Sequence, residues 1–124
     1  MEVVKTDDAP QAIGPYSQAI KSGGFVFCSG QIPLKSDGQM VEGGVVEQAN
    51  QVLTNLSAVL SAAGSDMNKA VKTTIYLDSM SDFTEVNEVY SKYFDNEIKP
   101  ARATVEVATL PKNVKVEIDC IAEL

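Results

Sequence analysis

The sequence predicts a single α+β domain, residues 1–124, in which two helices pack on one face of a mixed β-sheet. Two observations lead to this fold class. Two long segments repeat apolar residues at intervals of three and four, as amphipathic helices do, and shorter segments alternate apolar and polar residues, as strands do. These segments follow one another in the order β-β-α-β-α-β-β.

The first half of the chain predicts a hairpin, a long helix and a third strand. Residues 19–21 and 25–29 flank a Ser-Gly-Gly turn, in which glycine supplies the positive φ that a tight hairpin needs. A helical pattern of apolar residues covers 45–63, and Gly64 is placed to end that helix. The β-branched alternation over 71–77 then predicts a strand.

The second half predicts another helix and two more strands. The helix begins at Ser81 or Asp82, where Asp82 and Glu85 have the spacing of a capping box. It ends before Pro100, because proline cannot continue a helix. Strands are predicted over 103–107 and 114–122, with a loop between them.

Two helices can cover only one face of such a sheet, which leaves the other face open. The segment 25–28 reads Phe-Val-Phe-Cys and is therefore apolar on both sides of its strand. Its second apolar side needs a cover, because large exposed apolar patches mark contact surfaces. We expect the subunit to cover this face by self-association.

Composition narrows the possible chemistry. The chain has no histidine, so it lacks the usual general base near neutral pH and the commonest metal ligand. Its two cysteines, Cys28 and Cys120, have no CxxC spacing, so neither a zinc site nor a disulfide framework is predicted. Free thiols are therefore expected.

Net charge and hydropathy limit the kinds of partner and the cellular location that the sequence predicts. A net charge of −7 makes nucleic acid a poor partner, because it would repel a phosphate backbone. No apolar run reaches the roughly 20 residues of a membrane span. Residues 1–10 carry Asp7 and Asp8 where a signal peptide would be apolar, so a cytoplasmic protein is expected.

Arg102 and Glu117 are the first candidate site residues. Arg102 is the only arginine beside nine lysines, and only a guanidinium offers a planar fork that binds a carboxylate bidentately. The alternative is a structural ion pair with one of the 17 acidic residues. Alternation along the last strand places Glu117 on the face away from the helices. Glu117 is either a solvated surface carboxylate or, if another subunit covers that face, a partly buried group able to position water.

Tyr16 and Ser29 lie in or beside two loops at strand ends, where side chains can be held over a pocket. The loops read Gly-Pro-Tyr-Ser over 14–17 and Ser-Gly-Gln-Ile-Pro over 29–33. Each can equally be a turn, with Tyr16 as an aromatic packing residue. Neither segment has the spacing of a phosphate-binding loop.

Several segments together carry a resemblance to a known family. They follow one another in order along nearly the whole chain, and the sequence resembles the RidA (YjgF) family. The matching segments are GPYSQA at 14–19, CSGQIP at 28–33, NEVY at 87–90, KPARATVEVA at 99–108, LP at 110–111 and VEI at 116–118.

The resemblance implies a chorismate-mutase-like α+β fold that assembles as a homotrimer, with sites in the clefts between subunits. It also implies hydrolytic deamination of reactive enamines and imines such as 2-aminoacrylate and 2-aminocrotonate. Pyridoxal-phosphate enzymes, including serine and threonine dehydratases, release these compounds, and the link to them needs no stable complex. The products are 2-keto acids and ammonia, and no cofactor takes part.

Site roles follow from the resemblance residue by residue. Arg102 would bind the substrate carboxylate, and Glu117 would hold and activate the attacking water. Tyr16 and Ser29 would line the pocket. Thr104 stands where the family often has cysteine, so no thiol acts there, although the backbone of Thr104 could still contact the substrate nitrogen.

Two further positions match the family. Gly30 would let the backbone come close to the ligand, and Asn87 would fix the surrounding loop.

Two other functions remain open at this point. Endoribonuclease or translation-inhibitor activity is also attached to members of the family, although the acidic, histidine-free composition argues against RNA cleavage. The third possibility is a small-carboxylate-binding module with little turnover.

Overall fold

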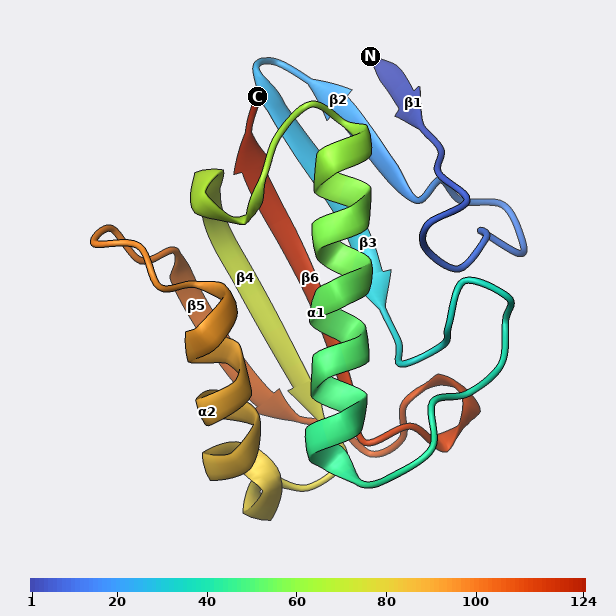
Figure 1. The fold of residues 1–124 in the computed structure, drawn as a ribbon, viewed down its shortest axis with the longest axis vertical. Helices are drawn as coiled ribbons and strands as arrows, with labels where there is room; N and C mark the ends of the chain where they lie inside the picture. Colours follow the sequence, from blue (N-terminus) through green and yellow to red (C-terminus); the bar gives the residue numbers. More distant parts are fainter.

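The computed structural model describes all 124 residues of the chain. It consists of one six-stranded sheet with two helices on one of its faces (Figure 1). Both the α+β class and the placement of the helices are therefore confirmed. Neither helix combines the length and apolar character needed to cross a membrane. The elements are β1 (Glu2–Val4), β2 (Ala19–Ser22), β3 (Phe25–Gln31), α1 (Val45–Ala62), β4 (Ala70–Leu77), α2 (Phe83–Tyr93), β5 (Ala101–Glu106) and β6 (Val116–Glu123).

The sheet is mixed, as the sequence predicts. Its strand order is β1-β2-β3-β6-β4-β5, and every neighbouring pair is antiparallel except β4 and β5. The C-terminal strand β6 lies between β3 and β4, so the last strand of the chain is at the centre of the sheet (Figure 1). Helix α2 connects the parallel pair, and β5 forms one edge of the sheet.

Helix α1 begins and ends where the sequence places it. Its N-cap is Gly44, whose N–H donates to the Glu47 side chain at 2.7 Å. The helix ends at Ala62, and Gly64 follows with a φ of +83°, a left-handed conformation that glycine adopts without a Cβ penalty.

Two local predictions differ from the structure. Strand β1 was not predicted, because three residues are too few to show an alternating pattern, yet Val3 pairs with Ile20 of β2. The prediction of a capping box formed by Asp82 and Glu85 is wrong. A 3-10 turn, Met80–Asp82, precedes α2, so Asp82 has helical φ and ψ and its side chain caps nothing.

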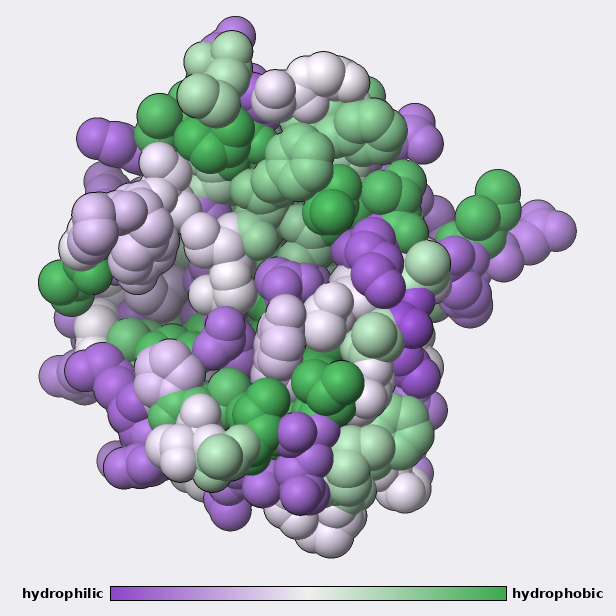
Figure 2. Space-filling model, turned by 180° about the vertical axis from the view of Figure 1, so that it is seen from behind, coloured by the Kyte–Doolittle hydropathy of each residue, from purple (hydrophilic) through white to green (hydrophobic).

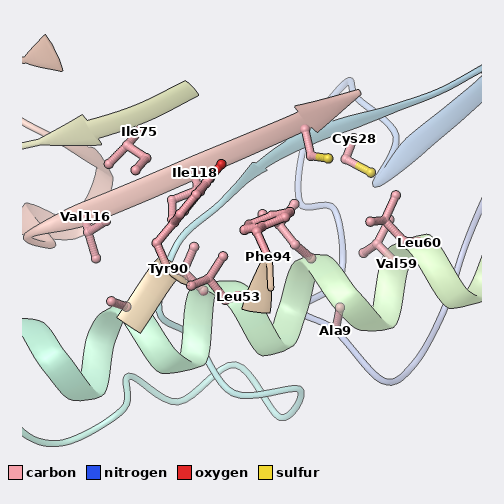
Figure 3. Packing of buried hydrophobic residues seen from close by; sticks show 14 of the residues in the cluster. Ala9, Cys28, Leu53, Val59, Leu60, Ile75, Tyr90, Phe94, Val116 and Ile118 are labelled. Carbon is pink, nitrogen blue, oxygen red and sulfur yellow. The ribbon is translucent and has the colours of Figure 1, made fainter. Parts of the chain in front are cut away.

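The core lies between the helices and the sheet. One face of α1 is fully buried, and Leu53, Val59 and Leu60 point from it toward β6 and Cys28 of β3 (Figure 3). Burying each leucine side chain contributes roughly 1.5–3 kcal/mol to folding. This packing holds the sheet as a rigid platform for the side chains on its other face.

The opposite face of the sheet carries an exposed apolar row. Val3, Ile20, Phe27 and Ile121 are aligned in register across β1, β2, β3 and β6. Phe27 is 44% exposed and Val3 56%, and Figure 2 shows hydrophobic surface gathered over this end of the face. The predicted uncovered apolar side of β3 is confirmed.

Candidate functional site

Arg102 lies on the edge strand β5 and points to the helix-covered side of the sheet. It pairs with the buried Thr73 of β4, and its guanidinium lies 4.9 Å from the ring centre of Tyr90 and 5.5 Å from that of Phe83. Its Nη1 atom donates a hydrogen bond of 2.7 Å to Oδ1 of Asn87. Three side chains of α2 therefore orient this one cation.

No carboxylate of the chain neutralises Arg102. The one ion pair in the structure joins Lys21 to Glu2, at 3.6 Å, at the edge of the sheet opposite to β5. This rules out, within one chain, the alternative that Arg102 serves as a structural ion pair. A guanidinium has five N–H donors, and the hydrogen bond to Asn87 uses one of them.

The guanidinium borders a pocket of about 400 Å³ between α2 and the start of β5. Ligand pockets range from roughly 300 to 1,000 Å³, so this one suits a small molecule. Its lining combines two cations with aromatic and small polar groups and contains no carboxylate. The lining residues are Asn87, Tyr90, Ser91, Phe94, Lys99, Pro100 and Arg102.

Glu117 lies on the other face of the sheet, as the alternation of β6 predicts. It pairs with Tyr76 of β4, and its side chain rests directly on the backbone of Gly30 in β3. A Cβ at residue 30 would overlap Oε2 of Glu117 and lie 2.9 Å from its Cδ. Glycine is thus required at this position for the carboxylate to occupy its place.

The surroundings of Glu117 disfavour its ionised form. Burial raises the pKa of the Glu117 carboxyl above its ordinary value, and the nearby charge of Asp119 raises it further. Tyr76 donates a hydrogen bond of 3.1 Å to Asp119. Burial and the same carboxylate raise the pKa of the Tyr76 hydroxyl.

Asp119 and Tyr76 were missed as site residues. Asp119 lies two residues after Glu117 on the same strand, so the two carboxylates share one face. That spacing was the available signal. The contact with Tyr76 was not visible, because it depends on the pairing of β4 with β6.

Tyr16 and Ser29 lie on the Glu117 side of the molecule. Tyr16 is 55% exposed and lines a second pocket, of about 300 Å³, together with Gly30. The Ser29 hydroxyl donates to the carbonyl oxygen of Ser17, and this bond fastens the Tyr16 loop to β3. Thr104 lies in β5 in register with Ile75, on the same side of the sheet as Arg102.

The predicted site residues thus form two groups on opposite faces of one sheet. The cationic group is Arg102 with Asn87, and the acidic group is Glu117 with Gly30 and Tyr16. Strand β4 separates β5 from β6, so the two groups are at least two strand spacings apart, roughly 10 Å. No set of three or more His, Cys, Asp or Glu side chains is arranged to hold a metal ion.

Fold and site together define a class: a small α+β domain with an unpaired arginine in an aromatic pocket and a half-buried carboxylate on the opposite face of its sheet. Comparison with known proteins narrows this class to one family. The family model described as endoribonuclease L-PSP matches residues 6–124. A mouse protein named 2-iminobutanoate/2-iminopropanoate deaminase is 52% identical over 122 residues, which cover 98% of this chain and 90% of the mouse protein. The chain belongs to the RidA (YjgF/L-PSP) family.

Solved structures of relatives have the same fold. RidA from the Antarctic bacterium Psychrobacter sp. matches with a TM-score of 0.94 and 41% identity over all of both chains. E. coli TdcF, crystallised with bound serine, matches with a TM-score of 0.95 and 40% identity, over all of this chain and 99% of TdcF. The expected RidA-type fold is therefore confirmed.

Proposed function

We propose that this protein hydrolyses 2-imino acids, and the enamines in equilibrium with them, to 2-keto acids and ammonia. Compounds such as 2-aminoacrylate and 2-aminocrotonate, released by pyridoxal-phosphate enzymes, are the proposed substrates. The observation that carries the proposal is the state of Arg102, which is oriented by α2, borders a small pocket and has no carboxylate partner. A substrate carboxylate is the partner that it lacks.

Arg102 binds the substrate carboxylate through its free N–H groups. The contact with Asn87 and the stacking on Tyr90 fix the plane of the guanidinium before the substrate arrives. A fixed fork loses little conformational entropy on binding, and it presents paired donors to a planar carboxylate. The imine carbon next to that carboxylate is thereby held in one position.

Glu117 positions and activates water. An enamine first takes a proton at carbon to become the imine, whose carbon is electrophilic. Water adds to this carbon while the Glu117 carboxylate accepts one of its protons, and the C=N bond becomes a carbinolamine. Glu117 returns this proton to the nitrogen, which gives the neutral carbinolamine. It then takes the hydroxyl proton and delivers it to the amine, the C–N bond breaks, and ammonia leaves a carbonyl group behind. A raised pKa suits Glu117 for both proton transfers, because catalytic groups work best with a pKa near the operating pH.

The site is completed between subunits. Arg102 and Glu117 lie on opposite faces of one sheet, so a single chain does not place both against one substrate. In a homotrimer, the Arg102 edge of one subunit faces the Glu117 face of the next. The exposed apolar row of Val3, Ile20, Phe27 and Ile121 supplies a surface for this assembly. Sedimentation at micromolar concentration tests the assembly, and a monomeric mass would contradict it.

The other site residues have supporting roles. Tyr16 closes the pocket beside Gly30, and Ser29 holds the Tyr16 loop in place. The backbone of Thr104 contacts the substrate nitrogen. The name of the mouse relative supports this activity, and the serine in the TdcF crystal supports a site of amino-acid size.

A coupled assay tests the activity directly. Threonine dehydratase and threonine generate 2-iminobutyrate, and the rate of 2-ketobutyrate formation is followed where spontaneous imine hydrolysis is limiting. The protein is expected to accelerate product formation in proportion to its concentration. An unchanged rate, together with tight binding of 2-ketobutyrate, would show a carboxylate-binding module and not an enzyme.

RNA cleavage is the competing activity, because the matching family model is named for an endoribonuclease. Net charge of −7 and the absence of histidine disfavour it. Cleavage of RNA that persists through repurification and survives Arg102→Ala would revive this activity for the chain.

A further inference from the structure

Lys99 lies in the Arg102 pocket, and the reaction described above gives it no task. It lines the same cavity of about 400 Å³, one residue before Pro100. Like Arg102, Lys99 has no carboxylate within ion-pair distance, since the one ion pair of the chain is formed by Lys21 and Glu2. Two uncompensated cations therefore border one small cavity.

The ammonium group of Lys99 uses only one of its hydrogen-bond donors. It donates one hydrogen bond of 2.9 Å to the carbonyl oxygen of Phe94, the residue that caps the C-terminus of α2. An ammonium has three donors, so two remain free. The bond to Phe94 also holds the ammonium at the cavity wall, because Phe94 itself lines the pocket.

The spacing of the two cations suits one short ligand. Residues 99 and 102 are three positions apart, so their Cα atoms are separated by at most roughly 10 Å. Both side chains are long and both reach the same cavity. A short dicarboxylate can therefore place one carboxylate on each of them.

We infer that Lys99 binds a second anionic group on the substrate, so that this pocket favours 2-imino dicarboxylates over 2-imino acids with an uncharged side chain. The inference rests on the proposed function, because Arg102 takes the carboxylate next to the imine. Ser91 in the same wall already donates its hydroxyl proton to the carbonyl oxygen of Glu88, so the free donors for the second carboxylate are those of Lys99.

A purely structural role for Lys99 makes a different prediction. A cation near a helix C-terminus stabilises the helix through its dipole. Removing the cation would then lower the melting temperature and leave the choice of ligand unchanged. Ligand selectivity is therefore the measurement that separates the two roles.

The first experiment measures binding of stable product analogues by calorimetry. Wild-type protein is expected to bind 2-ketoglutarate about tenfold more tightly than 2-ketobutyrate, as one charge-assisted hydrogen bond at a partly exposed site would produce. Lys99→Met should abolish this preference without weakening 2-ketobutyrate binding, and Lys99→Arg should retain it. Lys92→Met is the matched control, because Lys92 lies on α2 but outside the pocket.

The second experiment measures imine hydrolysis. Amino-acid oxidases generate the imines of 2-aminobutyrate and of glutamate, and semicarbazide traps the imine that the protein leaves unhydrolysed. Lys99→Met should lower kcat/KM about tenfold for the dicarboxylate alone. Equal loss for both imines, or no wild-type preference in either experiment, would overturn the inference.

The two experiments also separate this inference from the proposed function. Hydrolysis of both imines without a Lys99-dependent preference would support the proposed function and contradict a second anion-binding position at Lys99. A Lys99-dependent binding preference without hydrolysis of any imine would contradict the proposed enzymatic function and support the second anion-binding position.

Discussion

Asn87 accepts a hydrogen bond of 2.7 Å from the one arginine of the chain, Arg102, through a neutral amide oxygen. This contact orients the guanidinium without neutralising it. A carboxylate in place of the amide would orient the cation equally well, but it would also occupy the charge that a substrate needs. The difference between an amide and a carboxylate at residue 87 leads to the first prediction.

Asn87→Asp should impair the proposed imine hydrolysis more than Asn87→Ala does. The alanine variant loses one orienting hydrogen bond, worth about 0.5–1.5 kcal/mol, or roughly 2- to 12-fold in kcat/KM. The aspartate variant adds an ion pair that competes with the substrate carboxylate, so its KM should rise further. Steady-state kinetics with the threonine dehydratase couple measures both. A more active aspartate variant would show that Asn87 does not keep Arg102 free.

Arg102→Lys should be strongly impaired although it keeps the charge. Lysine lacks the planar fork and the stacking on Tyr90, so the expected loss is about 2–5 kcal/mol in transition-state stabilisation, or roughly 30-fold to several thousandfold in kcat/KM. Sedimentation of the variant controls for assembly, which should be unchanged. Wild-type rates would contradict a bidentate contact.

Gly30→Ala should remove activity while preserving the fold. The new Cβ meets only the end of the flexible Glu117 side chain, and the φ of Gly30 lies outside the left-handed region. Glu117 must therefore swing away, and kcat should fall about as far as in Glu117→Gln, by roughly 10²- to 10⁴-fold. The melting temperature distinguishes this result from misfolding: a large drop would show that the glycine is needed for the fold itself.

The acid limb of the pH–rate profile should report Glu117. Because the pKa of Glu117 is raised, activity should begin to fall at a higher pH than it would with an ordinary glutamate at this position. Asp119→Asn removes one cause of the shift and should move this limb to lower pH. The measurement is kcat/KM against pH for both proteins, with threonine dehydratase in excess. A limb that does not move would assign it to another group.

Glu117→Gln should also raise stability at neutral pH. A carboxyl whose pKa is raised by folding holds its proton more tightly in the folded state, so stability falls as the pH rises from its unfolded pKa to its folded pKa. Above that window the buried charge destabilises the fold, and a neutral amide avoids this penalty. Thermal melts at neutral and at acid pH should therefore differ for the wild type more than for the variant.

Both cysteines should be inert in the folded protein. Burial raises the pKa of the Cys28 thiol and of the Cys120 thiol to about 12, and only a thiolate is an effective nucleophile. Iodoacetamide should label neither residue at neutral pH, and both should react in guanidinium chloride. Rapid labelling of the native protein would show that the sheet opens at β3 and β6.

The sequence predicts this fold well where long periodic patterns exist. Helix α1 over Val45–Ala62 and strand β6 over Val116–Glu123 each bury one regular set of side chains, and burial of that set determines both the element and its orientation. Short elements could not be predicted from the sequence. Strand β1 has three residues and exists only because β2 offers it a paired edge. The 3-10 turn before α2 replaced the predicted capping box for a similar reason, since its geometry depends on the chain leaving β4.

By itself, the sequence predicted the candidate site residues: the single Arg102, the outward-facing Glu117 and the glycine at residue 30. Only the tertiary structure decided how they are arranged. The pairing of β4 with both β5 and β6 places Arg102 against α2 and Glu117 on the far face of the sheet, and no local pattern encodes this relation. It also brings Lys99 to the pocket of Arg102 and Asp119 to Tyr76. Contacts between strands distant in sequence depend on the packing of the whole chain, whereas the face of a strand to which a side chain points follows from its own alternation.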